Sequence, residues 1–191
     1  MSVVKGNSGY IKSKKKREII KTCIEFGMVL VVFFTGYLTT KTRLNLLTVA
    51  AVLGCLPAAK ALVGVIMLLP HHSMEKEKVV EIDEKSPKLV KAYDMILTSY
   101  EKIMPIDSIV LFENIVCGYT SSSKVDVNST ASYIKKMLGN DRYDKVSVKI
   151  FKDYKTYLAR VESMENMAEA EKEISQEHEE GIKRTILSLS M

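Results

Sequence analysis

The chain has 191 residues, of which 47% are hydrophobic, and a formal net charge of +5. The charge is unevenly divided, because residues 1–70 carry ten basic and two acidic side chains whereas residues 71–191 carry eighteen basic and twenty-one acidic ones. The basic character therefore belongs to the first part of the chain, which excludes a basic nucleic-acid-binding surface as the expectation for the remainder.

The first 21 residues predict a basic tail on the cytoplasmic side of a membrane. Residues 1–11 show no periodicity and are expected to be loose. The residues expected to contact anionic lipid head groups are Lys14, Lys15, Lys16 and Arg17.

Two apolar runs follow. Residues 22–40 contain Glu25 as their only charge, and residues 44–70 contain only Lys60. About 20 helical residues cross the hydrocarbon core, so both runs are long enough. The sequence predicts a transmembrane hairpin over 22–70, with helices at about 22–40 and 46–69. The alternative, a cleaved signal peptide, is disfavoured because no small-residue cleavage site follows the first run and the second run begins at once.

The flanking charges predict the orientation of the hairpin. Six basic residues stand between positions 12 and 21, whereas the connecting loop offers only Lys41 and Arg43. Basic flanks stay on the cytoplasmic side. We therefore expect a multi-pass protein of the cell membrane whose N-terminus and C-terminal domain are both cytoplasmic.

Small residues follow one another along one face of the second run. Ala51, Gly54, Ala58 and Ala61 recur at steps of three and four, which is the spacing of one helix face. Small side chains let helix backbones approach closely in membranes. This face is predicted to pack on the first helix or on another copy, with Gly27 as a candidate on the opposite side.

Lys60 lies near the middle of the second run, where a charge costs about 2.5–3.5 kcal/mol. Pro57, three residues earlier, frees a backbone carbonyl. Three explanations stay open. Lys60 is buried against such carbonyls or snorkels, it pairs with Glu25 at an axial offset of about 7 Å, or it lines a polar path in an oligomer.

The rest of the chain predicts a small α/β domain, sandwich-like and ending in a long helix. Residues 71–85 are charged and turn-rich and are interpreted as a linker, with a short strand or a helical turn at Val79–Ile82 as an alternative. The domain is therefore expected over 86–191. The predicted elements are a helix over 87–102, one strand or two over 106–119 meeting near Glu113–Asn114, a helix from Asn128 or Ser129 to Gly139, a strand over 146–151, and one long helix or two consecutive ones over 153–189.

The search for chemistry finds few candidates. The chain has no Gly-rich phosphate loop, no G-x-S-x-G and no H-E-x-x-H. One pattern consists of acidic residues on a predicted strand followed by a lysine on a later strand, namely Asp107, Glu113 and Lys149. It is similar to the pattern of metal-dependent nucleases of the restriction-enzyme type. Those enzymes carry an acidic residue two positions before the lysine, where this chain has Ser147, so one metal ligand is missing. Solvent-facing strand charges are the competing interpretation.

Neither a metal nor a cofactor is expected. The three cysteines show no paired spacing, and two of the three histidines are neighbours in the sequence, His71 and His72. Eight glutamates between Glu162 and Glu180 indicate a solvated helix face or, with Met164 and Met167, a contact surface for a partner helix.

These features predict an integral membrane protein that presents a cytoplasmic binding or scaffolding domain at the inner face, without catalysis of its own. One alternative is a membrane-tethered, nuclease-like effector that uses Asp107 and Glu113. Another is a small oligomeric transport or pore-forming protein organised around Lys60 and Pro57. The expected partners are membrane lipids and either further copies or another protein, not nucleic acid.

Overall fold

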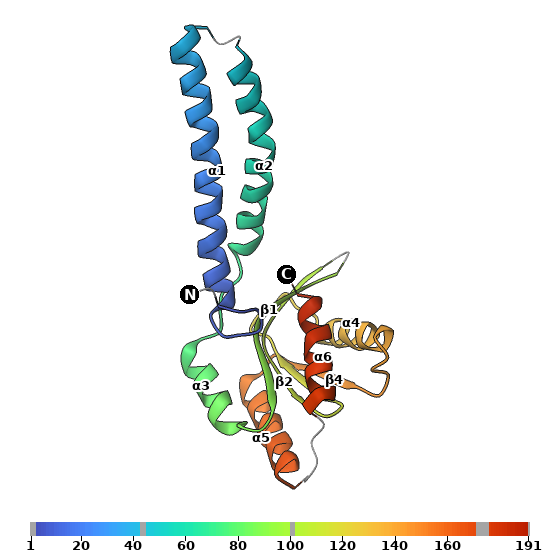
Figure 1. Cartoon of the computed structure of the whole chain (residues 1–191). Coiled ribbons are helices and arrows are strands. Elements are labelled where there is room, and N and C mark those ends of the chain that lie inside the picture. The colour runs from blue at the N-terminus through green and yellow to red at the C-terminus, as the bar shows by residue number, and fades with distance from the viewer. Residues whose placement is uncertain (1–2, 43–44, 100–101, 171–175, 191) are drawn as a thin grey trace. The chain divides into compact units, whose positions relative to one another are not determined.

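The computed structural model describes residues 3–42, 45–99, 102–170 and 176–190. Arg43 and residues 171–175 of the acidic run lie outside these ranges. The described chain divides into two units, which we call the hairpin (Ile11–His72) and the domain (Met1–Tyr10 with Ser73–Met191). Figure 1 shows both units.

The hairpin consists of two long apolar helices, α1 (Tyr10–Thr40) and α2 (Leu46–Leu68). Helix α1 begins within the basic tail, so the basic residues belong to the same helix as the apolar run. Helix α2 starts at Asn45, whose side-chain oxygen accepts a hydrogen bond from the Thr48 N–H at 2.8 Å. Both helices are long and apolar enough to cross a membrane.

The domain is built on a mixed four-stranded sheet. Its strands are β1 (Val90–Thr98), β2 (Ile103–Phe112), β3 (Ile115–Tyr119) and β4 (Ser147–Phe151), in the order β1-β2-β3-β4. Strand β2 is antiparallel to both β1 and β3, and β4 is parallel to β3. The predicted strands over 106–119 and 146–151 are confirmed, with the first region divided at Glu113–Asn114.

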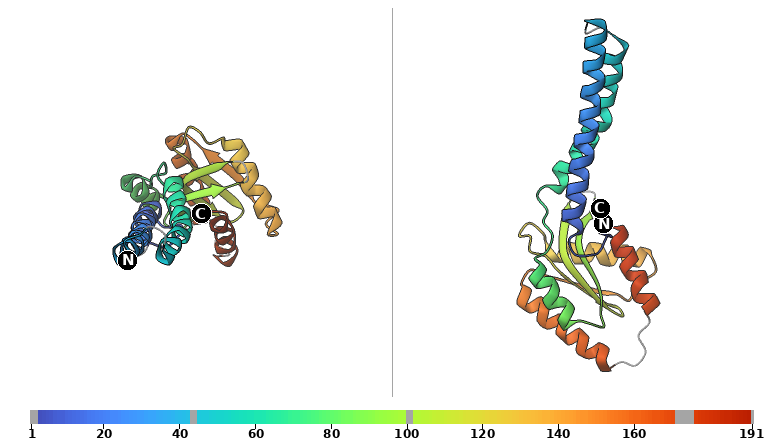
Figure 2. Two further views of the ribbon diagram at one scale, coloured as in Figure 1. Left: turned by 90° about the horizontal axis from the view of Figure 1, so that it is seen from above. Right: turned by 60° about the vertical axis from the view of Figure 1, so that its left-hand side comes forward.

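Helices cover both faces of the sheet (Figures 1 and 2). Helices α3 (Lys76–Lys85) and α5 (Tyr154–Ala170) pack on one face, and α4 (Val127–Asn140) and α6 (Gln176–Ser188) pack on the other. Each face has its own apolar core. Tyr157 and Met164 are fully buried in the first core, and Ile134 and Ile182 are fully buried in the second.

The helix predicted over 87–102 is wrong, because residues 90–98 form β1. Both faces of this strand are covered: Leu89 and Tyr93 belong to one core, and Ala92 and Met95 belong to the other. A strand buried on both faces loses the apolar and polar alternation that identifies strands in sequences.

Two segments that were expected to be a loose tail and a linker belong to the domain. Within residues 71–85, predicted to be a linker, α3 buries Val79 and Ile82 in the core. The tail before α1 is also fixed, since the Tyr93 N–H donates to the Gly6 carbonyl at 2.7 Å. Of the one long helix or two consecutive ones predicted over 153–189, the structure has two, α5 and α6, which lie on opposite faces of the sheet.

Candidate functional site

The small-residue face of α2 lies toward α1. Ala51, Ala58 and Ala61 are buried, and a Cβ built at Gly54 would lie 3.1 Å from the Val29 Cγ2 atom. Gly27 is not part of this contact, because a Cβ there would meet no atom within 4 Å. The two helices therefore meet through the small residues of α2 and larger side chains of α1.

The two charges within the apolar runs, Glu25 and Lys60, do not pair with each other. The Glu25 Oε1 atom lies 3.9 Å from the Lys21 Nζ atom, and its Oε2 atom is buried without a hydrogen-bond partner. Lys60 is exposed, and no ion pair joins it to any residue that the structure describes. Pro57 lies exposed inside a continuous α2.

The basic residues at the start of α1 have different surroundings. Lys14 is half-buried, whereas Lys16 and Arg17 are exposed. The Lys15 ammonium instead donates to the carbonyls of Leu69 and His71, at 2.8 and 3.0 Å. Lys15 thus satisfies carbonyls at the end of α2. Burial lowers the pKa of His71, and the nearby charge of Lys15 lowers it further.

The most constrained polar residue of the domain is Asp94, in the middle of β1. Its side chain is only 1% exposed, and its φ of 55° lies in the left-handed region. The Oδ1 atom accepts a hydrogen bond from the Met74 N–H at 2.9 Å, and the Oδ2 atom accepts one from the Gly9 N–H at 2.7 Å. Asp94 therefore ties together the two backbone segments that flank the hairpin in the sequence.

Sequence reasoning missed Asp94. The signal was a single acidic residue within the apolar stretch Ala92–Leu97, but the helical interpretation placed it off the apolar stripe and so in water. A charge in a strand that is covered on both faces needs hydrogen-bond partners from other segments. The correct strand assignment would have pointed to this residue.

Asp107 lies directly opposite Asp94 on β2, because Tyr93 pairs with Ser108 and Met95 pairs with Ile106. The Asp107 Oδ2 atom accepts a hydrogen bond from the Ser121 N–H at 2.6 Å. Burial raises the pKa of Asp107, hydrogen bonds from Ser121 lower it, and the charge of Asp94 raises it. Backbone amides of the domain thus bind both carboxylates, those of Gly9 and Met74 on Asp94 and that of Ser121 on Asp107.

The structure does not bring Asp107, Glu113 and Lys149 together. Asp107 lies within β2 and Glu113 in the turn that follows it, six residues further along the chain, a span of about 20 Å at the rise of an extended strand. Lys149 is exposed on β4, two strands from β2, and its Nζ atom lies 5.2 Å from the centre of the Phe151 ring. Among the described residues, no three His, Cys, Asp or Glu side chains are grouped to hold a metal ion.

The glutamates of the acidic run that lie on α5 differ in their exposure. Lys85 pairs with Glu162 at 2.7 Å, and buried Glu165 accepts hydrogen bonds from the Lys88 N–H at 3.3 Å. Met164 is fully buried, so it does not contribute to a contact surface for a partner. The interpretation as a solvated face is therefore wrong for Glu165, whereas Glu162, whose side chain is 48% exposed, agrees with it.

Glu179 holds the turn between β2 and β3. Its side chain is 2% exposed, and its Oε1 atom accepts a hydrogen bond from the Glu113 N–H at 2.6 Å. Glu113 needs this support because its φ of 47° is unusual for a residue with a side chain. The nearby Asn114 Oδ1 atom lies 3.0 Å from the His178 Nε2 atom. The first turn of α6 thus fixes the turn.

Glu179→Gln is expected to remove a pH dependence of stability. Burial raises the pKa of Glu179, although the bond from Glu113 opposes this. The protonated carboxyl therefore stabilises the fold below its pKa in the unfolded chain, and this contribution is lost as the pH rises through the folded pKa. Glutamine keeps the acceptor without the charge, so the variant should be at least as stable as the wild type at pH 7, with the difference vanishing toward pH 4.5.

Urea unfolding at both pH values measures this effect. Glu179→Ala is the matched control, because it leaves the Glu113 N–H unpaired and should lose about 1–3 kcal/mol at both pH values. A glutamine variant that is as destabilised as the alanine variant at pH 7 would contradict the assignment.

No model of a known protein family matches the chain, and comparisons with curated proteins and with solved structures find no significant match. The arrangement of its own residues is therefore the basis for a functional proposal. It offers a hairpin with an apolar exterior and a domain whose buried carboxylates bind its own backbone.

Proposed function

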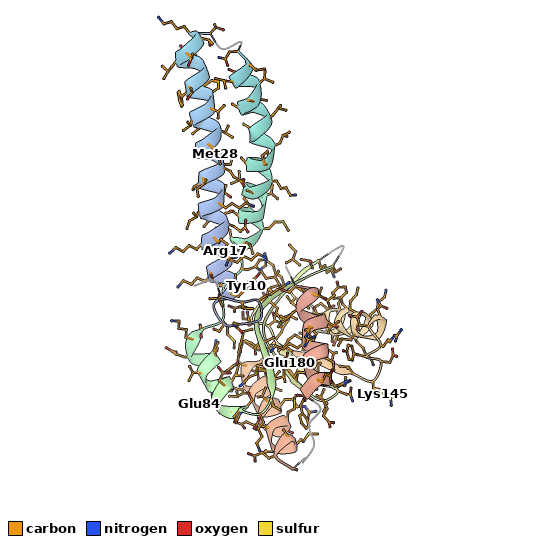
Figure 3. All side chains as sticks on the ribbon, in the orientation of Figure 1. Tyr10, Arg17, Met28, Glu84, Lys145 and Glu180 are labelled. Carbon is orange, nitrogen blue, oxygen red and sulfur yellow. The ribbon has the colours of Figure 1, made fainter. Side chains whose placement is uncertain are left out.

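We propose that the chain is an integral membrane protein whose hairpin crosses the membrane twice and holds the domain at the cytoplasmic face. The observation that carries this proposal is the exterior of the hairpin. Exposed large apolar side chains cover both helices, with Met28, Val31 and Leu56 among them (Figure 3). Elsewhere in the described chain, such residues are only Val4, Val80, Ile103 and Met167.

Soluble monomers rarely expose a contiguous apolar surface of this extent, and most of their exposed apolar residues are scattered singly. Helices of this length match the hydrocarbon thickness of a bilayer, and lipid contact would remove their side chains from water. The domain has the opposite character, since its isolated exposed apolar residues are normal for a surface in water. The contrast supports a membrane hairpin and a water-exposed domain.

The proposed orientation rests on the distribution of basic residues. Lys16 and Arg17 are exposed at the start of α1, before the apolar part of the helix. These residues favour the cytoplasmic side, where anionic lipids attract them. Because the hairpin reverses direction, the domain lies on that same side.

Labelling from the two sides of the membrane tests this arrangement. In a chain with its three cysteines replaced by alanine, we place one cysteine at Thr42 in the loop or at Lys136 on the exposed surface of α4. In intact cells, a membrane-impermeant maleimide should modify the Thr42→Cys chain and should modify the Lys136→Cys chain only after permeabilisation. Equal labelling of both positions in intact cells would contradict the proposal.

For the domain, we propose binding or scaffolding at the membrane surface rather than catalysis. Asp94, Asp107 and Glu179 all accept hydrogen bonds from backbone amides of the domain. Such bonds fix the fold and occupy groups that a catalytic site would need free. The nuclease-like alternative requires Asp107 and Glu113 to converge on one metal, and about 20 Å of strand separates them.

A cleavage assay distinguishes these two functions. The purified chain in nanodiscs, supplied with DNA and Mg²⁺ or Mn²⁺, should not cleave the DNA. Native mass spectrometry of the same sample should detect a protein that is bound in fixed stoichiometry. Cleavage that is lost in both Asp107→Ala and Glu113→Ala would contradict the binding role.

A further inference from the structure

Lys60 has no partner for its charge within the described part of its own chain. It is exposed on α2, on a different side of the helix from the buried Ala58 and Ala61. On the proposed function, this position lies near the bilayer centre, about 12 Å from the end of α2 at Leu68. Its Cα–Cβ bond leans toward the start of α2, away from the nearer boundary, which opposes escape of the ammonium to that boundary. The charge therefore needs an acidic partner.

Glu25 has unused hydrogen-bonding capacity at nearly the same depth. Contacts of Gly54 with Val29 and of Gly36 with Leu47 set the antiparallel register of the hairpin. Extended along the helices, this register places Glu25 level with Ala58, so it is only two residues, or about 3 Å, from the level of Lys60. This corrects the axial offset of about 7 Å expected from the sequence.

The carboxylate of Glu25 is only weakly neutralised within the described part of its own chain. Its side chain is 24% exposed, its ion pair with Lys21 has the long distance of 3.9 Å, and the partner Lys21 is itself mostly exposed. The Oε2 atom and the neighbouring Thr22 hydroxyl are both buried without a hydrogen-bond partner. An unsatisfied carboxylate oxygen in an apolar layer is costly.

We propose that a second copy of this chain binds through the hairpin, with Lys60 of each copy pairing with Glu25 of the other. The inference rests on the proposed membrane insertion. Copies inserted with the same orientation keep their depths, so residues that are level within one chain are also level between chains. Each chain contributes one cation and one anion, and a symmetric pair therefore matches all four charges.

Charge complementarity selects a second copy as the partner. Both charges lie on the same unit, at the same level and in an apolar layer where few other ions are available. Polar and charged groups in transmembrane helices generally face partners within the bundle rather than lipid. The small residues of α2 are already used against α1, so they do not supply this second contact.

A charge exchange tests the pairing in the full chain in nanodiscs. Lys60→Glu and Glu25→Lys should each weaken self-association about tenfold, as measured by donor and acceptor fluorophores on separate copies, and the double variant should restore it. Lys60→Met removes the charge without adding one and should also weaken self-association. Glu18→Gln, one heptad before Glu25 on α1, is the matched control and should have no effect.

Cross-linking provides an independent readout, which does not require the charge-exchanged variants to be well expressed. The three native cysteines are replaced by alanine, and one copy carries Lys60→Cys while a differently tagged copy carries Glu25→Cys. Oxidation should join the two tags, and a copy with Leu38→Cys in place of Glu25→Cys should not cross-link. A wild-type chain that is membrane-inserted but monomeric would overturn this inference and leave the proposed function standing. Single charge variants that associate normally would do the same. So would a disulfide yield between Lys60→Cys and Glu25→Cys that equals the yield with the Leu38→Cys control. A chain that alkaline carbonate extracts from membranes would instead overturn the proposed function.

Discussion

A chain carrying both Val31→Asp and Leu56→Asp is expected to lose stable membrane integration. Both side chains lie near the middle of the apolar runs and are 65% and 70% exposed. Aspartate at the centre of a transmembrane helix costs about 3 kcal/mol, and the lost apolar residue adds about 0.5 kcal/mol, so the two substitutions together cost about 7 kcal/mol. The fraction of chain that resists alkaline carbonate extraction measures the effect.

The result separates two descriptions of the hairpin. If water surrounded it, aspartate at these exposed positions would change stability by no more than about 0.5 kcal/mol and would increase solubility. Val80→Asp on α3 is the control, because its side chain is also exposed but belongs to the domain. We expect this control to remain with the membrane. A double variant that stays integrated as well as the control would contradict a lipid-facing exterior.

Asp94→Ala is expected to destabilise the domain by about 3–5 kcal/mol. The substitution removes two hydrogen bonds to a buried charged acceptor, each worth about 1.5–3 kcal/mol, and leaves the amides of Gly9 and Met74 unpaired. It also leaves alanine at a φ of 55°, where aspartate and asparagine are better tolerated. This loss is a large part of the stability of a small domain.

Two further substitutions separate the contribution of the Asp94 hydrogen bonds to stability from that of its backbone conformation. Asparagine tolerates the same backbone conformation and keeps one oxygen acceptor, so Asp94→Asn should lose about half as much stability as Asp94→Ala. Glycine relieves the backbone strain but restores neither bond, so Asp94→Gly should lie between them. Near-UV circular dichroism of the tyrosines follows thermal unfolding in detergent. Asp144→Ala, at an exposed carboxylate, is the control. Equal stability of all three variants and the wild type would contradict a clamp at this position.

The hairpin could be predicted from the sequence because the length of an apolar run is enough to identify a helix of this kind. Two apolar runs with one charge each require no knowledge of what packs against them. The position of Lys60 relative to Glu25 could not be predicted as well, because it depends on the register between the helices. That register is set by individual contacts such as Gly54 with Val29.

Local patterns predicted the elements of the domain unevenly. The strands over 106–119 and 146–151 were recognisable from their β-branched residues, whereas β1 resembled a helix because helices cover both of its faces. Helix α3 was obscured by its many charges, although Val79 and Ile82 already marked its buried side. The break between α5 and α6 depends on which face of the sheet each helix covers, which no local pattern shows.

The candidate sites show the same distinction between features that a local sequence pattern reveals and features that depend on the fold. Asp107 and Glu113 were predicted as candidate metal ligands because they are acidic residues near strands. Only the structure of the sheet shows that they are far apart. The roles of Asp94 and Glu179 depend on amides that are 85 and 66 residues away in the sequence. Contacts of that kind can be found only once the fold is known.

The most direct test of the account replaces residues 11–72 by a short Gly-Ser linker. The Gly9 and Met74 amides bind the two oxygens of one carboxylate, so a few residues suffice to join the chain ends. Carbonate extraction and size-exclusion chromatography are then applied to both proteins. We predict that the full chain stays in the membrane pellet and that the shortened protein is soluble, folded and free of membrane. A full chain that is released into the supernatant, or a shortened protein that is unfolded or still membrane-bound, would contradict the division into a membrane hairpin and a self-contained domain.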